Sequence, residues 1–192
     1  MAIDLKRPVA PDPYTILPSV AAFTLTSSDF SAGQALAGPQ TAEGGGISPQ
    51  LSWSGFPEQT ASFLLTCYDP DAPREGGFWH WVVADIPPNV TSIPEGVPVS
   101  MMKALANRFF RPPSSIGVTS ALDLPNTAGT SGYIGAAPPK GDRVHRYFFA
   151  VHALNVEQLS LPHGRRTAPA LVSATAIPYT IARGVLVGTC QR

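Results

Sequence analysis

Proline and glycine interrupt this 192-residue chain at short intervals, because the sequence contains 21 prolines and 17 glycines. Proline has no backbone N–H and its ring obstructs the preceding turn of a helix, so few stretches of the chain can sustain a long helix. Short strands joined by tight turns remain compatible with this spacing. The sequence therefore predicts a fold that is mainly β, with at most short helices.

Composition indicates one folded domain over residues 1–192 and excludes several classes of protein. Apolar residues make up 44% of the chain and charged residues 14%, as in globular proteins, and the length suits a single core. The 13 basic and 13 acidic residues balance, and no basic run is present that would bind a nucleic-acid backbone. No apolar run approaches the roughly 20 residues that span a bilayer, and the N-terminus lacks the apolar core of a secretory signal. We therefore expect a cytoplasmic protein with no transmembrane segment and no nucleic-acid partner.

Four stretches have the composition of strands. Each is rich in β-branched or aromatic residues and is bounded by turn-forming residues. They are residues 62–68, 79–84, 146–154 and 184–189.

Three further segments are not expected to be strands. Residues 1–20 are predicted to form an extended arm, and residues 167–183 can form only short helices because Pro169 and Pro178 interrupt them. Residues 101–110 place four large apolar side chains at helical spacing before a proline pair. This segment is either a surface helix that packs one face on the core or a mobile lid that contacts a ligand or lipid.

Two carboxylates directly follow the first predicted strand. Asp69 and Asp71 alternate with Pro70 and precede Pro73. Along an extended backbone the two side chains would point to the same side, although a cis bond before either proline would change this. The alternative for either aspartate is a turn in which its carboxylate accepts hydrogen bonds from neighbouring backbone N–H groups.

Two histidines lie near other predicted strands. His80 is flanked by Trp79 and Trp81 within a β-like stretch, and His145 ends a loop that contains a proline pair and Gly141. Either histidine alone is consistent with a buried structural residue. Their occurrence together with the two carboxylates favours a polar site.

The order of these motifs carries a resemblance to a known family. Residues 69–73 (Asp-Pro-Asp-Ala-Pro), residues 78–81 (Phe-Trp-His-Trp) and residues 135–147 resemble the two signature regions of the phosphatidylethanolamine-binding protein (PEBP) family. The similarity extends over about residues 23–192 and is strongest to the bacterial branch that is similar to Raf kinase inhibitor protein. It implies a β-sandwich of mostly antiparallel strands with a few peripheral short helices, and a pocket for phosphate-like head groups. The positions that match this pocket are Asp69, Asp71, Phe78, His80, Pro138, Pro139, His145 and Tyr147.

The chemistry of such a pocket would suit an anion. Two histidines can donate hydrogen bonds to it, more strongly if a carboxylate raises their pKa. The aspartates would orient the imidazoles or meet a cationic amine such as ethanolamine. Arg143 or Arg146 could add positive charge, although Arg146 could equally be a structural ion-pair partner.

Three functions remain open at this point. The first is binding of a small anionic molecule or phospholipid head group, with regulation of a protein partner as an extension. The second is an enzyme that uses Asp69, Asp71, His80 and His145 for acid–base cyclisation, isomerisation or lyase chemistry in a bacterial natural-product pathway. The third is a zinc or manganese site, but the spacing matches no standard metal motif, so we expect no metal and no cofactor.

Three features depart from the family pattern. Arg143 occupies a loop position that is often glycine, Ala136 and Ala137 replace the residues that commonly precede the proline pair, and residues 97–117 look longer than the corresponding connection. These features favour the second function, an acid–base enzyme, in which residues 97–117 would form an elaborated loop or lid.

Overall fold

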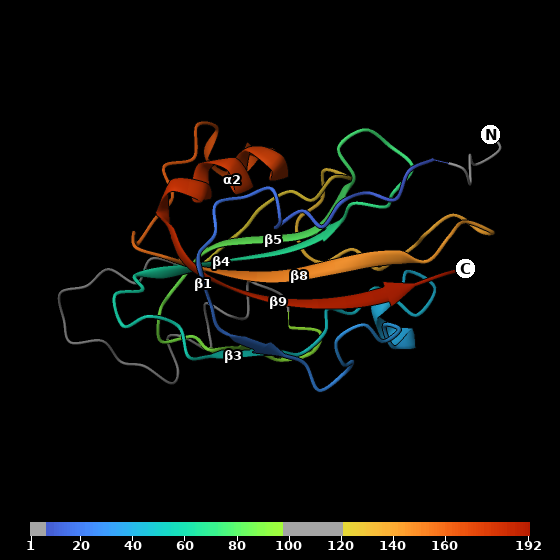
Figure 1. Ribbon diagram of the computed structural model, residues 1–192, viewed down its shortest axis with the longest axis horizontal. Helices are drawn as coiled ribbons and strands as arrows, with labels where there is room; N and C mark the ends of the chain where they lie inside the picture. The colour runs from blue at the N-terminus through green and yellow to red at the C-terminus, as the bar shows by residue number, and fades with distance from the viewer. Residues whose placement is uncertain (1–6, 98–120) are drawn as a thin grey trace.

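A computed structural model describes residues 7–97 and 121–192 of the chain (Figure 1). The predicted helix or lid at 101–110, and residues 98–117 of the longer segment, lie outside the described residues. The described chain is mainly β, with two sheets and one short α-helix.

A six-stranded sheet forms the centre of the molecule, in the order β1-β9-β8-β4-β5-β7. β1 runs parallel to β9, and the other neighbours are antiparallel. All four predicted strands belong to this sheet and lie next to one another within it. Its strands are β1 (Ala21–Ala22), β4 (Ser62–Asp69), β5 (Phe78–Ile86), β7 (Leu122–Asp123), β8 (His145–Leu154) and β9 (Thr180–Cys190).

A smaller antiparallel sheet packs on one face of the large sheet. It consists of β2 (Thr24–Thr26), β3 (Leu51–Ser54) and β6 (Ser92–Ile93) and lies below the large sheet in Figure 1. Trp53 of β3 packs edge-on against Phe63 of β4, with ring centroids 5.5 Å apart, inside a core shared by both sheets. The predicted β-sandwich of mostly antiparallel strands is confirmed.

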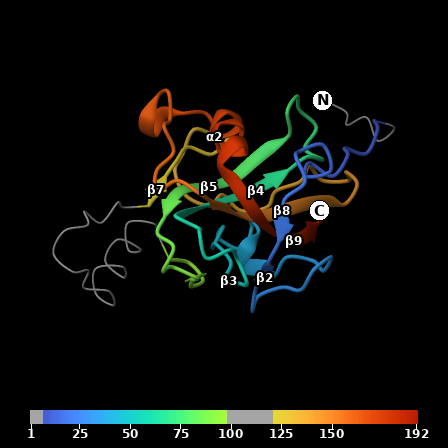
Figure 2. The same ribbon diagram turned by 60° about the vertical axis from the view of Figure 1, so that its left-hand side comes forward.

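The opposite face of the large sheet carries α2 (Pro169–Ala176), as Figures 1 and 2 show. Val172 and Ala176 of this helix pack against Leu64 and Val82 of the sheet. Pro169 begins the helix instead of interrupting it, because the first residues of a helix need no N–H donor. Residues 180–183, which the sequence placed in the helical region, belong to β9.

Three short 3-10 helices complete the described elements, namely η1 (Gly38–Gln40), η2 (Gly164–Arg166) and η3 (Ile177–Tyr179). Every helix within residues 7–97 and 121–192 is short, as the spacing of proline and glycine predicts. None of those in the described part of the chain is long and apolar enough to cross a membrane.

Residues 7–20 contain neither helix nor strand and run over the same face as α2 (Figure 1). Tyr14 anchors this N-terminal arm, because its ring packs edge-on against Phe148 and His152 of β8. The Arg183 guanidinium also lies over the Tyr14 ring, 4.8 Å from its centroid. The arm therefore covers the outer face of β8 and β9.

Candidate functional site

Polar residues gather at one end of the large sheet because of the directions of its strands. β4 ends at Asp69, and its antiparallel neighbours β5 and β8 begin there, at Phe78 and His145. Asp69 is paired with Phe78, and His145 is paired with Cys190 at the end of β9. The alternation of β8 turns His145 and Tyr147 to the face that carries the smaller sheet.

A β-bulge determines where His80 points. Cys67 pairs with Trp81 while the next residue, Tyr68, pairs with Trp79, so His80 is an extra residue in β5. Such bulges redirect a side chain and are common beside functional sites. The His80 ring lies between two aromatic rings, 4.6 Å from that of Phe78 and 5.0 Å from that of Tyr147.

Hydrogen bonding fixes the tautomer of His80. Its Nδ1 lies 2.7 Å from the carbonyl oxygen of Ile134, which can only accept, so Nδ1 carries the hydrogen. Burial lowers the pKa of His80, so the ring is neutral near pH 7 and Nε2 presents a lone pair. Among the described residues, no group is hydrogen-bonded to this Nε2.

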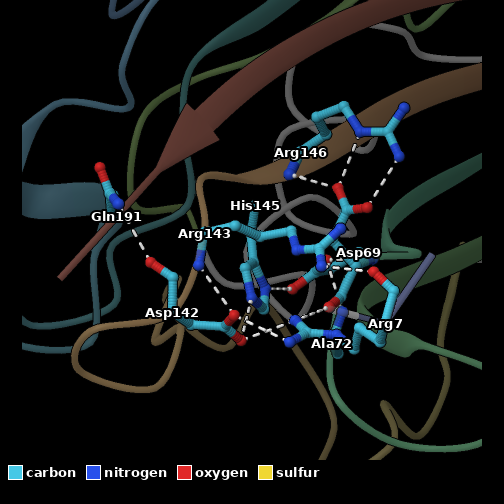
Figure 3. Close-up of polar contacts among 9 residues, drawn as sticks. Arg7, Asp69, Ala72, Asp142, Arg143, His145, Arg146 and Gln191 are labelled. Atoms are coloured by element: carbon cyan, nitrogen blue, oxygen red, sulfur yellow. Dashed lines mark hydrogen bonds and ion pairs between the residues drawn. The ribbon is translucent and has the colours of Figure 1, made fainter. Parts of the chain in front are cut away.

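His145 is held between two carboxylates. Its Nδ1 lies 2.8 Å from Oδ2 of Asp69, and its Nε2 lies 3.0 Å from Oδ2 of Asp142 (Figure 3). Burial alone would lower the pKa of His145, but the hydrogen bonds to Asp69 and Asp142 outweigh it and raise the pKa above its ordinary value. The ring is therefore an imidazolium that uses both of its N–H groups on carboxylates. It has no donor left for an external anion.

Each of these carboxylates is itself fixed. Asp69 Oδ1 accepts the backbone N–H groups of Asp71 and Ala72, at 2.8 and 3.1 Å, and this closes the turn after β4. Asp142 receives both guanidinium nitrogens of Arg7, at 2.8 and 2.7 Å, and these hydrogen bonds hold the pKa of Asp142 well below its usual range. The ring of His145 is consequently clamped from two sides.

Asp71 points away from His145, in contrast to the expectation that it shares a side with Asp69. Its carboxylate binds Arg146, with Oδ1 and Oδ2 each 2.7 Å from a guanidinium nitrogen. Burial alone would raise the pKa of Asp71, but the hydrogen bonds from Arg146 outweigh it and lower the pKa. Strand alternation did not apply, because β4 ends at Asp69 and Asp71 already belongs to the turn.

A cavity of about 350 Å³ opens beside these groups. Gly135 and Ala42 form part of its wall, where their backbones approach so closely that a Cβ on Gly135 would lie 2.5 Å from the nitrogen of Ala42. Seven of the eight residues proposed from the sequence line this cavity, whereas Asp71 lines a neighbouring cavity of about 220 Å³. The seven are Asp69, Phe78, His80, Pro138, Pro139, His145 and Tyr147.

Comparison with known proteins identifies the family that uses this arrangement of strands. A family model described as phosphatidylethanolamine-binding protein matches residues 26–191. The chain belongs to the PEBP family. The resemblance expected from the three motifs is confirmed, and membership in this family supports ligand binding in general.

Bacterial members of the family are similar along most of the chain. The UPF0098 protein YbcL of Escherichia coli is 39% identical over 150 residues, covering 76% of this chain and 75% of YbcL. The crystal structure of YbcL matches with a TM-score of 0.74 and covers 88% of this chain and 98% of that one. YbhB of Escherichia coli is 40% identical over 122 residues, covering 64% of this chain and 68% of YbhB. A phosphatidylethanolamine-binding protein from Plasmodium vivax, 15% identical with a TM-score of 0.56, shares the fold across 94% of this chain and 90% of its own.

Sequence reasoning missed three charged residues in and beside this cavity of the PEBP-family chain. Arg74 lines the cavity and lies in the turn directly after the Asp-Pro-Asp-Ala-Pro motif, so its nearness to that motif could have revealed it. Asp142 lies three residues before His145, and this spacing was visible in the sequence but was not used. Arg7 is 135 residues from Asp142, and nothing in the sequence pattern connects them.

The two arginines considered from the sequence face away from the cavity. Arg146 is the ion-pair partner of Asp71, and Arg143 donates to the carbonyl oxygen of Arg7. Neither lines the cavity next to His80, although Arg143 lines the neighbouring one. In the part of the chain that the structure describes, no group of three or more His, Cys, Asp or Glu residues is arranged to hold a metal ion.

Proposed function

We propose that the protein binds a small molecule through an anionic group of the phosphate type, such as a phospholipid head group or a free phosphate ester. The ligand would occupy the cavity between His80 and Arg74. The observation that carries this proposal is the pairing, within one largely apolar cavity, of a cationic guanidinium with a histidine nitrogen that no described group uses.

Charge balance in and around the cavity favours an anion. Asp69 and Asp142 are matched by the imidazolium of His145 and the guanidinium of Arg7, and Asp71 is matched by Arg146. The charges of these carboxylates are therefore cancelled, and Arg74 is left as the dominant charge at the cavity wall.

An aromatic contact holds Arg74 at this edge of the cavity. Its guanidinium lies 5.6 Å from the centroid of the Phe78 ring.

A phosphate monoanion would satisfy both groups. One of its charged oxygens accepts hydrogen bonds from Arg74, and its remaining P–OH donates to the lone pair of His80 Nε2. The volume of about 350 Å³ falls at the small end of ligand pockets, which suits a head group better than a whole lipid.

The acid–base alternative depends on His80 alone. His145 uses both ring nitrogens on Asp69 and Asp142, and Asp71 is bound to Arg146. Asp69 uses one oxygen on His145 and the other on two backbone N–H groups, so none of these three is available for proton transfer in this arrangement. The same geometry therefore gives binding more support than catalysis.

Titration calorimetry with inorganic phosphate and with phosphoethanolamine tests the proposal. We expect Arg74→Ala to weaken phosphate binding about tenfold, because a charge-assisted hydrogen bond is lost. His80→Phe should weaken it similarly, since phenylalanine keeps the ring and removes the acceptor. Arg166→Ala, which removes an exposed arginine that does not line the cavity, is the matched control and should bind as the wild type does. Unchanged phosphate affinity in both cavity variants would contradict the proposal.

A further inference from the structure

The N-terminal arm contributes a side chain to the site, although it lies outside residues 26–191 that match the family model. Arg7 reaches the end of the large sheet, where it binds both carboxylate oxygens of Asp142 (Figure 3). Its Nη2 also donates to the carbonyl oxygen of Asp71, at 2.9 Å. One guanidinium thus joins the turn after β4 to the loop before β8, and these two segments border the cavity.

The backbone of the arm is tied down at Arg7 itself and three residues further along, at Ala10. Arg143 donates to the carbonyl oxygen of Arg7, and Arg146 Nη2 donates to the carbonyl oxygen of Ala10 at 2.6 Å. The Arg7 side chain is 20% exposed, whereas that of Asp142 is 0% exposed. The arm is therefore held where its arginine covers a fully buried carboxylate.

Arg7 has a direct effect on the charge beside the cavity. Arg7, Asp142, His145 and Asp69 form a continuous chain of alternating charges. Without Arg7, the two carboxylates would share one imidazolium and leave an excess negative charge next to the cavity. Asp142 would also lose the two donors from Arg7 that help to fix its orientation toward His145 Nε2. Apart from His145 itself, it would keep only one described donor, the backbone N–H of Arg143, which donates to its Oδ1 at 2.8 Å.

We propose that Arg7 is a positioning residue of the cavity: it fixes Asp142, and through it the ring of His145, and it cancels a charge that would repel an anion. This inference rests on the proposed anion-binding function and adds to it a residue from outside the region matched by the family model. Lysine at this position would keep the charge but could not bind both carboxylate oxygens in a planar fork.

The first measurement is the affinity for inorganic phosphate at pH 6.5. We expect Arg7→Gln to bind about tenfold more weakly, the size expected for one unit charge near a partly buried site. Arg7→Lys should recover the affinity to within about threefold, because it restores the charge. The control, Arg166→Ala, lowers the net charge of the protein by the same amount at an exposed position and should leave the affinity unchanged.

The second measurement is hydrogen exchange at the two ring N–H groups of His145, observed by NMR with nitrogen-15 labelling. The groups that face this ring are Asp69 from β4, Asp142 from the preceding loop and His80 from β5. In Arg7→Gln we expect faster exchange at Nε2–H, which faces Asp142, and unchanged protection at Nδ1–H, which faces Asp69. General loss of stability would instead accelerate both.

The outcomes separate this inference from the proposed function. Absence of phosphate binding by the wild type would overturn the proposed function, and the exchange at Nε2–H would still decide the role of Arg7. Wild-type binding that persists unchanged in Arg7→Gln would overturn the role of Arg7 alone. Weaker binding without faster exchange would overturn the positioning of His145. If Arg7→Gln does not fold, Arg7→Lys replaces it, and wild-type exchange at Nε2–H in that variant would overturn the inference.

Discussion

Strand β8 carries two buried histidines that lie in opposite chemical environments. His145 begins the strand on the inner face, and His152 lies seven residues later on the outer face, so the alternation of the strand separates them. Two carboxylates receive the ring of His145 and raise its pKa. His152 is buried with no carboxylate partner among the residues that the structure describes, and burial together with Arg183 lowers its pKa to about 3. One strand therefore holds a charged imidazole at the cavity and a neutral one under the arm.

The two histidines have opposite effects on how stability depends on pH. The folded pKa of His145 is raised, so its contribution is complete below the unfolded pKa of about 6.5 and is lost as pH rises through the folded pKa. The folded pKa of His152 is lowered, so its contribution is complete above about pH 6.5 and is lost as pH falls toward 3. Burial therefore favours the neutral form of a histidine in this sheet, and only carboxylate partners such as those of His145 outweigh it.

Asp69→Asn should have the largest effect, because it removes one of the two carboxylates that distinguish His145 from His152. Asparagine can keep the turn by accepting the N–H groups of Asp71 and Ala72, but its other atom becomes a donor facing His145 Nδ1–H. The imidazolium is then no longer favoured, so we expect the pKa of His145 to fall and the free energy of unfolding to drop by about 3 kcal/mol. Urea unfolding and an NMR titration of His145 measure both changes.

The control for this change is Asp12→Asn, which removes an exposed carboxylate and keeps the acceptor for the Tyr14 backbone N–H. We expect its free energy of unfolding to stay within about 0.5 kcal/mol of the wild type. A raised His145 pKa that survived Asp69→Asn would show that Asp142 alone maintains the imidazolium.

Much of this architecture could be predicted from the sequence. The four long strands follow from β-branched and aromatic composition between turn residues, and the resemblance placed seven of the eight proposed residues around one cavity. The fold and family predictions are confirmed because they depend on local composition and on motifs whose order along the chain is visible, whereas the ligand-binding role of the seven residues stays a prediction.

The parts that could not be predicted depend on contacts between distant residues. The bulge at His80 arises from the register of β5 against β4, and no local pattern specifies it. The end of β4 at Asp69 turned Asp71 toward Arg146, and the expectation that His145 would donate to an anion left out Asp142. Arg7 could not be assigned, because its partner lies 135 residues further along the chain.

His152→Asn should have a moderate effect, which appears in how the stability of the protein depends on pH. The asparagine carbonyl can replace His152 Nδ1 as the acceptor for Arg183 Nε, which lies 3.2 Å away, and it has no titration in this range. The charged groups that face this position are Arg183 from β9 and, at high pH, Tyr14 from the arm. Between pH 7 and pH 5, the stability of the variant relative to the wild type should improve by about 2 kcal/mol.

Chemical denaturation of both proteins at the two pH values provides the measurement, and only the change in their difference matters. A constant difference between pH 7 and pH 5 would show that His152 accepts a proton in the folded state, and the contrast with His145 would then disappear. Substitution of the exposed His163 by asparagine is the control and should give no such change.

Tyr14→Phe is the smallest of these changes and tests how the arm is held over His152. The Tyr14 hydroxyl lies 3.5 Å from Thr66 Oγ1, at the limit of a hydrogen bond, whereas its ring contacts Phe148, His152 and Arg183. Phenylalanine keeps every ring contact, so we expect a loss of about 0.5 kcal/mol or less, against about 3 kcal/mol for Tyr14→Ala. Equal losses in the two variants, measured by thermal unfolding, would contradict an aromatic anchor. If the ring carries the attachment, the arm is held by packing over His152 and by charge at Arg7, and added salt should loosen only the Arg7 end.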